Sequence, residues 1–280
     1  MNAWAPGELA FTQDQLRQMQ KIYYGLGSNK WKEGVERGWH CHGPHVFDQG
    51  LHGKSVEPGF HASWNRAAHF LSTQFTQKAS SNLYLWLHSV ACSHFMGGAN
   101  DVLMGPEKVG VFRDRKDAIQ AIFAAPEHAL REGAEKEFDR LNASMKERFG
   151  TTLGTFEKKS PKEVVLKETV MGQNKMKAIY DFFCQQLHTE LEQAQNPDQK
   201  FEAICRFYRY CDYSHPVRDG CGRSDLLMLN FLLTQNGFHP VLLDAPYLSN
   251  VVTEKEWIEY VRQGLKNWEQ EKATLGKGTA

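Results

Sequence analysis

The strongest constraint on the fold is a nearly all-apolar helix that follows a glycine-containing turn. From Leu226 to Leu233, apolar residues occupy almost every face of a helix, so other elements must enclose it. Gly237 is the residue expected to end this helix. Shortly before it, the nine residues from His215 to Arg223 read His-Pro-Val-Arg-Asp-Gly-Cys-Gly-Arg. A central, enclosed helix of this kind predicts a mainly α-helical protein.

The turn itself has the residues of an anion-binding site. Gly220 and Gly222 leave backbone N–H groups uncovered at the start of a helix, where the helix dipole is positive. Arg223 adds a planar guanidinium in the first helical turn, and Asp219 offers a hard oxygen ligand suited to Mg²⁺. His215 lies just outside this group, where a base would be useful. We therefore expect the turn to bind phosphate.

Further helices are predicted on both sides of the turn. Apolar residues at helical spacing favour helices over 174–194 and 197–213. The second of these has Asn196 as its N-cap, followed by a proline at the first helical position. Thr253 and Glu256 form a capping box at the start of a last helix.

Between residues 151 and 169 the pattern changes from helical to strand-like. Threonines at the start of this stretch and the apolar run from Val164 to Leu166 are separated by Ser160-Pro161. A turn signal between two such segments predicts a short β-hairpin.

The region before the hairpin is expected to be helical and rich in loops. Residues 12–24, 63–76 and 81–96 have helical character, and 115–148 is interpreted as two charged amphipathic helices broken near Pro126. The glycines and prolines between these segments predict long irregular connections, which are often functional.

One of these connections, over residues 38–61, is rich in histidine and aromatic residues. His40, Cys41, His42 and His45 raise the hypothesis of a metal site. We favour the simpler interpretation of an insert that packs or recognises a target protein, because exposed aromatic residues are typical of partner surfaces.

Charge and cysteine content limit the kinds of partner and compartment. Lys and Arg balance Asp and Glu at 33 each, so no global positive field would attract nucleic acid or a membrane surface. The six cysteines contain no CxxC pair, and no basic and apolar signal peptide opens the chain. We expect a cytoplasmic protein with reduced thiols. Delivery into another cell, as a bacterial effector or toxin that needs no cleavable signal, is an alternative.

The residues from His215 to Arg223 resemble the signature HPFx(D/E)GN(G/K)RxxR of the Fic (filamentation induced by cAMP), or Fido, family. Seven of the nine positions agree, counting the free fourth position. The order of elements over residues 150–270 is also similar. The resemblance implies a helical core with a small β-hairpin, the flap, before the motif. We therefore expect a helical and loop-rich N-terminal extension over 1–149, a Fic-like domain over 150–272 and a flexible tail over 273–280.

The resemblance also implies roles for the residues of the turn. His215 would be the general base that takes the proton from a Ser, Thr or Tyr hydroxyl of a target protein. Asp219 would hold Mg²⁺, and Gly220, Cys221 and Gly222 would approach the nucleotide phosphates. Arg223 would neutralise charge on the departing phosphates. The implied activity is transfer of a nucleoside monophosphate, with AMP from ATP favoured.

Three departures from the signature leave alternatives open. Val217 replaces a core phenylalanine, Cys221 replaces an asparagine that normally bonds phosphate, and Leu226 replaces the second arginine. Family members that lack this arginine transfer phosphate, and another branch transfers phosphocholine from CDP-choline. The donor is therefore open, and UTP and CDP-choline are alternatives to ATP. A non-catalytic, partner-binding protein is a further alternative. A hydrolase in which Cys221 and His215 act as a nucleophile and base is another.

Overall fold

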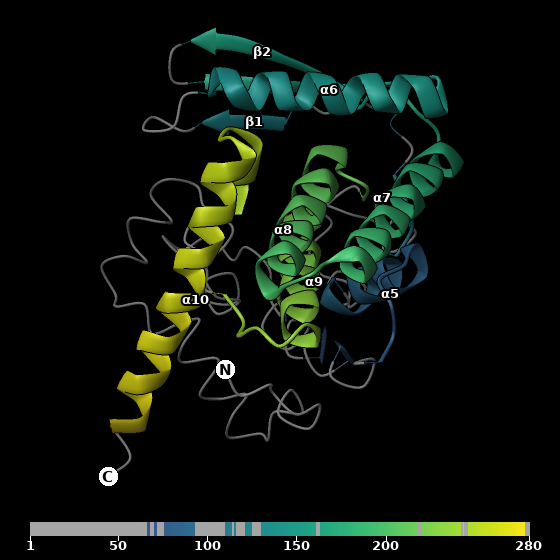
Figure 1. Cartoon of the computed structure of the whole chain (residues 1–280). Coiled ribbons are helices and arrows are strands. Elements are labelled where there is room, and N and C mark those ends of the chain that lie inside the picture. Colours follow the sequence, from purple (N-terminus) through teal and green to yellow (C-terminus); the bar gives the residue numbers. More distant parts are fainter. Residues whose placement is uncertain are drawn as a thin grey trace, which may run out of the picture. The chain divides into compact units, whose positions relative to one another are not determined.

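The structure is a computed structural model that describes residues 76–92, 110–113, 121–124, 130–160, 163–217, 220–241 and 246–277, with positions 66, 67, 70, 71, 115 and 243. Helices dominate this part of the chain, as predicted (Figure 1). The main elements in chain order are α5 (Ser81–Ala91), β1 (Ala121–Ala124), α6 (Glu132–Phe149), β2 (Gly154–Ser160), β3 (Glu163–Glu168), α7 (Gln173–Gln193), α8 (Pro197–Ser214), α9 (Cys221–Gln235), the 3₁₀ helix η5 (Pro246–Asn250) and α10 (Glu254–Lys277).

The chain divides into two compact units. One comprises Met1–Gly110, Gly222–Pro246 and Tyr260–Ala280, and the other comprises Val111–Cys221 and Tyr247–Glu259. The second unit contains the β-sheet with α6, α7 and α8, and it includes His215, Gly220 and Cys221. The domain boundaries expected after residues 149 and 272 stay predictions. Helix α10 continues to Lys277, into the stretch expected to be a tail.

The predicted hairpin is present and forms part of a three-stranded antiparallel sheet of order β1-β3-β2. Gly154 pairs with Glu168 and Lys158 with Val164, so β2 and β3 are neighbours along their length. Figure 1 shows α6 running along this sheet, and Phe138 of α6 contacts Phe156 of β2 with ring centroids 4.7 Å apart. The sheet and α6 therefore share a core.

Strand β1 corrects one sequence-based expectation. Residues 115–148 were expected to form two helices, but Ala121–Ala124 pairs with β3, Ala121 opposite Leu166. Pairing along the second edge of β3 decides the conformation of this short apolar segment, because its local propensity is weak. The second expected helix is confirmed as α6, which Gly150 ends in the left-handed conformation (φ 65°).

Helices α7 and α8 form a pair with the predicted start and stop signals. The Asn196 side chain accepts a hydrogen bond from the backbone N–H of Gln199 at 3.0 Å, and Pro197 opens α8. These contacts satisfy a helix N-terminus that would otherwise leave donors bare. The buried stripe of α7 consists of Met176, Ile179, Tyr180, Phe183, Cys184 and Leu187.

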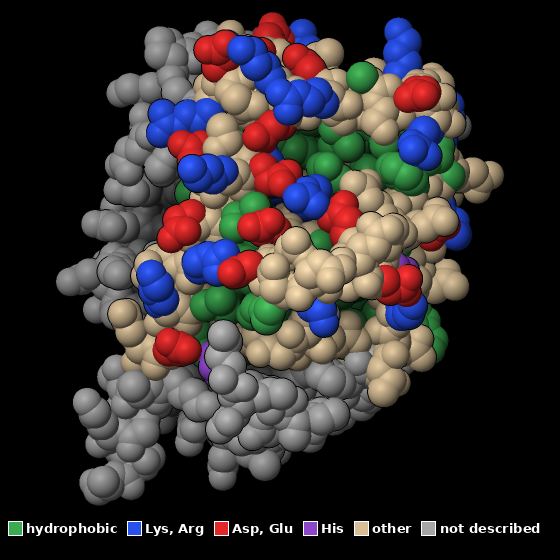
Figure 2. Space-filling model, in the orientation of Figure 1, with side chains coloured by type: hydrophobic (Ala, Val, Ile, Leu, Met, Phe, Trp, Pro, Cys, Tyr) green, Lys and Arg blue, Asp and Glu red, His purple; other side chains and the backbone are tan. Residues whose placement is uncertain are grey.

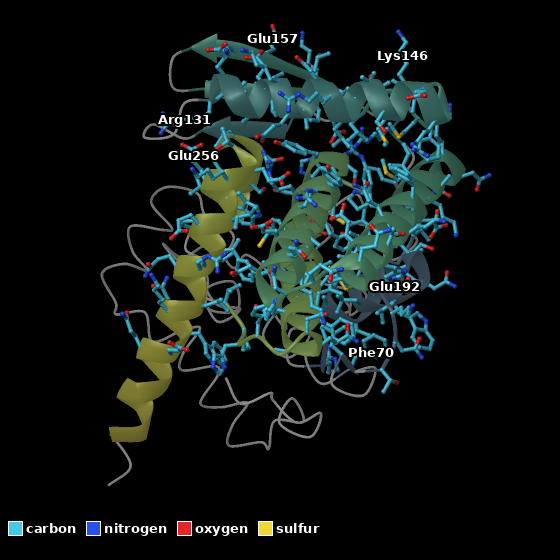
Figure 3. The ribbon with its side chains drawn as sticks, in the orientation of Figure 1. Phe70, Arg131, Lys146, Glu157, Glu192 and Glu256 are labelled. Carbon is cyan, nitrogen blue, oxygen red and sulfur yellow. The ribbon has the colours of Figure 1, made fainter. Side chains whose placement is uncertain are left out.

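The start of α10 belongs to the same unit and is capped as expected. The backbone N–H of Thr253 donates to Glu256 at 2.9 Å, and the N–H of Glu256 donates back to the Thr253 hydroxyl at 3.3 Å. Arg131 lies 3.5 Å from Glu256, and Figure 3 shows the two side chains together. Trp257 is fully buried and stacks on Tyr208 of α8 at 5.0 Å.

The other unit contains α5 and most of α9. The buried residues of α9 include Leu226, Leu227, Leu229, Phe231, Leu232 and Leu233, so the prediction of an enclosed helix is confirmed. Gly237 follows its end with a positive φ of 83°. Tyr84 of α5 donates to Asp225 of α9 at 2.8 Å, which links the two helices inside the core.

The described surface mixes both signs of charge. On the face shown in Figure 2, acidic and basic side chains are interspersed, in line with the balanced composition. None of the helices that the structure describes is long and apolar enough to cross a membrane.

Candidate functional site

His215 lies at the C-terminal end of α8 in a conformation that is unusual for a residue with a side chain. Its backbone is left-handed (φ 40°, ψ 63°), and among the described residues it is the only non-glycine with a positive φ. Pro216 favours an extended conformation for the residue before it, so the helix end was predicted but the left-handed backbone was not. Such a conformation costs about 1–3 kcal/mol and persists only where the surroundings impose it.

A buried carboxylate lies against the imidazole. Glu168, the last residue of β3, places Oε1 3.2 Å from Nδ1 of His215. The Glu168 side chain is 1% exposed, whereas that of His215 is 20% exposed. A buried group therefore contacts one side of the imidazole, and part of the ring is still exposed to solvent.

Two arginines neutralise Glu168 from the other side. Nη1 of Arg113 lies 2.8 Å from Oε2 of Glu168, and Nε of Arg115 lies 3.8 Å from the same oxygen. Burial alone would raise the pKa of Glu168, but the hydrogen bond with His215 and the charges of Arg115 and Arg113 outweigh it and lower the pKa. Glu168 is thus a carboxylate, and an ionised carboxylate only accepts hydrogen bonds.

Arg115 also ties the end of α8 to the hairpin. Its guanidinium is completely buried and donates to the backbone carbonyls of Leu153, at 2.7 Å, and Ser214. Burial lowers the pKa of Arg115 to about 10, although the charge of Glu168 opposes this shift. The backbone N–H of Arg113 adds a hydrogen bond to the Pro216 carbonyl at 2.8 Å. The residues on both sides of His215 are therefore fixed.

A second buried hydrogen-bond network anchors the last turn of α8, which ends just before His215. Asp212 accepts hydrogen bonds from the Ser249 hydroxyl and from the Asn250 amide, the latter at 2.5 Å. Burial raises the pKa of Asp212, and these two donors together with the nearby His215 oppose the shift. Arg209 donates to the Ser249 carbonyl at 2.9 Å, so η5 is bound to α8 through several contacts.

Only one of the two glycines of the turn has a backbone conformation that favours glycine. Gly220 is buried with a φ of 74°, a conformation that favours glycine. Gly222 is exposed, and a Cβ added there would meet nothing within 4 Å. Internal packing therefore does not require glycine at position 222. The absence of a side chain there leaves space at the first turn of α9.

All three departures from the expected signature are buried. Val217 and Leu226 are 1% and 4% exposed, so each serves as a core residue. The Cys221 thiol donates to the Val217 carbonyl at 3.0 Å and is 8% exposed. The position expected to contact phosphate thus directs its side chain to the backbone of the turn.

Several expected site residues lie outside the described residues. These are Asp219, the expected Mg²⁺ ligand, the side chain of Arg223, and the histidine-rich stretch over 38–61. Their roles stay predictions. Within the part of the chain that is described, no cluster of three or more His, Cys, Asp or Glu side chains could hold a metal ion.

The structure adds residues to the site that the sequence did not indicate. Glu168 contacts His215, and Arg113 and Arg115 contact Glu168, although all three are 47 or more positions away from His215 in the chain. No local pattern distinguishes Glu168 from the other charged residues of the hairpin. Only the pairing that brings the end of β3 to the end of α8 could have identified it.

Comparison with known proteins supports the fold. No protein-family profile and no curated protein matches the chain. The chain is similar to the crystal structure of a Fic domain-containing signaling protein from Bacteroides thetaiotaomicron, with a TM-score of 0.52 over 95% of this chain and 93% of that one. This chain has a Fic-like fold. At 12% sequence identity the likeness extends to the fold alone. The Fic-like fold agrees with the predicted helical core and hairpin.

Proposed function

We propose that the chain is a Mg²⁺-dependent transferase that moves AMP from ATP onto a Ser, Thr or Tyr hydroxyl of a target protein. The observation that carries the proposal is the imidazole of His215, which lies 3.2 Å from buried Glu168 and precedes Gly220 by five residues in the chain. A group for proton transfer beside a glycine turn at a helix start suits phosphoryl chemistry. The Fic-like fold supports a transferase in general.

In this reaction the hydroxyl oxygen of the target attacks the α-phosphorus of ATP. His215 takes the hydroxyl proton, the bond from the α-phosphorus to the bridging oxygen breaks, and pyrophosphate leaves with that electron pair. The backbone around Gly220 and Gly222 would bind the phosphates, and the predicted role of Arg223 is to neutralise charge on the leaving group. The protein therefore contributes mainly positioning and charge stabilisation.

The donor chemistry of the turn fits a magnesium ion. Mg²⁺ in phosphate-transfer sites is held by one or two carboxylates together with substrate phosphates and water, and Asp219 supplies one carboxylate next to Gly220. When bound, the ion neutralises phosphate charge. We place the protein in the cytoplasm, where ATP and Mg²⁺ are available, and we expect its partner to be a protein rather than nucleic acid.

The test is transfer of label to proteins of a cell lysate. ATP labelled at the α-phosphate, ATP labelled at the γ-phosphate, UTP and CDP-choline are supplied separately, and mass spectrometry identifies the added group. We expect α-label to be transferred by the wild type and not by His215→Ala. If only the γ-label or only phosphocholine is transferred, the donated group is phosphate or phosphocholine and not AMP. The absence of transfer from every donor, or equal transfer by the variant, would refute the proposal.

One observation favours a second candidate, a non-catalytic protein that binds a partner. The Cys221 thiol donates to the Val217 carbonyl, so it does not supply the amide donor expected at this position. If this loss abolishes nucleotide binding, Cys221→Asn should create ATP affinity that the wild type lacks. Calorimetric titration of both proteins with MgATP decides between the candidates, because measurable affinity in the wild type rules out the second.

A further inference from the structure

A neutral imidazole carries its proton on one nitrogen and accepts with the other, so its neighbours decide which nitrogen is the base. In His215, Nδ1 lies 3.2 Å from Oε1 of Glu168. The carboxylate can only accept and is negatively charged, so a proton on Nδ1 is favoured over a lone pair that would face this oxygen. The lone pair is then on Nε2, the nitrogen at the far end of a ring that is 20% exposed.

The orientation of Glu168 is itself fixed. Arg113 is a permanent donor and lies 2.8 Å from Oε2, so the two oxygens have different partners: Oε2 faces guanidinium groups and Oε1 faces His215. The backbone N–H of Thr169, the next residue, donates to the Leu153 carbonyl at 3.1 Å, which holds the strand end in place. The carboxylate has little freedom to turn away.

We propose that Glu168 is the positioning residue of His215 in the transfer reaction. It holds the ring through Nδ1, so that Nε2 takes the proton of the acceptor hydroxyl, and its negative charge stabilises the imidazolium that results. Glu168 itself stays ionised, as the carboxylate does in the general acid–base template of serine hydrolases. This inference rests on the proposed function of His215 as a base.

The isosteric substitution Glu168→Gln gives the proposal its sharpest consequence. An amide has one oxygen and one NH₂ group, and Arg113 requires the oxygen on its side because a guanidinium cannot accept. The NH₂ group would then face Nδ1 of His215 and donate to it. This reverses the tautomer, places the proton on Nε2 and removes the base, while the shape of the side chain is unchanged.

The tautomer can be measured without any transfer activity. In ¹⁵N-histidine-labelled protein at alkaline pH, the nitrogen shifts report which ring nitrogen is protonated. The His215 signal is assigned by its loss in His215→Ala. We expect the proton on Nδ1 in the wild type and on Nε2 in Glu168→Gln. The wild-type measurement does not depend on Glu168→Gln, so it tests the proposal even if that variant does not fold.

Glu190→Gln is the matched control. Glu190 also pairs with an arginine, Arg206 of α8, at 2.5 Å. Arg206 precedes His215 by nine residues, which is about 13 Å along a helix. This control should leave the His215 tautomer and the transfer rate unchanged.

Activity provides the second measurement. Loss of a general base costs about 10²–10⁴-fold in rate, so Glu168→Gln should lower kcat by at least about 100-fold with little change in the nucleotide KM. A wild-type proton on Nε2, or a variant with unchanged kcat, would overturn the positioning role. If no donor is transferred at all, the proposed function fails, and the tautomer still shows whether Glu168 controls His215.

Discussion

Arg115→Met tests whether the buried guanidinium is what fixes the end of α8. Methionine fills a similar elongated space but offers no donor. The change removes the hydrogen bonds to the carbonyls of Leu153 and Ser214. Glu168 keeps its ion pair with Arg113, whose Nη1 lies 2.8 Å from Oε2. It loses only the charge of Arg115, whose Nε lies 3.8 Å from the same oxygen.

The magnitude follows from two opposing effects. The Ser214 carbonyl loses its donor, and a buried acceptor left without a partner costs about 1–3 kcal/mol. The Leu153 carbonyl keeps the hydrogen bond from the Thr169 N–H at 3.1 Å, so losing the second donor there costs only about 0.5–1.5 kcal/mol. Against this, burial disfavours the guanidinium charge, which is why its pKa falls to about 10, and methionine recovers that desolvation. The lost hydrogen bonds outweigh the recovered desolvation, because methionine cannot satisfy the Ser214 carbonyl and water has no access to a site with no exposed surface. We expect a net loss of about 1–3 kcal/mol in the free energy of unfolding.

Urea unfolding followed by circular dichroism measures this loss as a lower midpoint at an unchanged m-value. Arg206→Met is the matched control, because Arg206 also bridges two partners, Glu190 at 2.5 Å and Glu254 at 2.8 Å. Its side chain is 26% exposed and its partners can be rehydrated, so it should cost about 1 kcal/mol or less. A loss for Arg115→Met below about 1 kcal/mol, or no larger than the control, would refute the reasoning.

Two further predictions concern the same site. The folded-state pKa of Glu168 lies below the ordinary value of 4.5, so its stabilising effect is complete above that pH and is lost as pH falls through the lower folded value. The difference in unfolding free energy between wild type and Glu168→Gln should therefore shrink as the pH falls below about 4.5; an unchanged difference between about pH 5 and pH 3 would contradict the lowered pKa. At the left-handed position, His215→Gly should be about 1 kcal/mol more stable than His215→Ala in the same urea assay, because both lose the imidazole and only glycine avoids the backbone strain. Equal stability would show that the strain is absent.

Features determined by neighbouring residues were predictable from the sequence. The Asn196 cap, the Thr253 and Glu256 capping box and the end of α9 at Gly237 each depend on residues a few positions apart. The hairpin followed from a turn signal between two strand-like runs. The enclosed character of α9 followed from composition alone, because a helix that is apolar on all faces has no stable exposed arrangement.

Features that depend on distant pairing were not predictable. Strand β1 contains only four residues, and its conformation comes from β3, which follows it by about 40 positions. The left-handed backbone of His215 opposes the preference that Pro216 imposes, so no local rule could indicate it. Long-range hydrogen bonds to the neighbouring backbone, such as that from Arg115 to the Ser214 carbonyl, maintain it instead.

The same opposition between local preference and observed structure is an argument about function. A glycine at position 215 would end α8 at lower energetic cost, yet the chain has histidine there together with a buried carboxylate and two arginines that hold it. Strained positions that require several buried charges to maintain them cluster at sites where geometry matters more than stability. The proposed role of His215, a base that keeps one tautomer and one orientation, would account for this arrangement. The backbone strain at His215 and the ion pair at Glu168 both support this proposal, and Arg115 contributes to each of them.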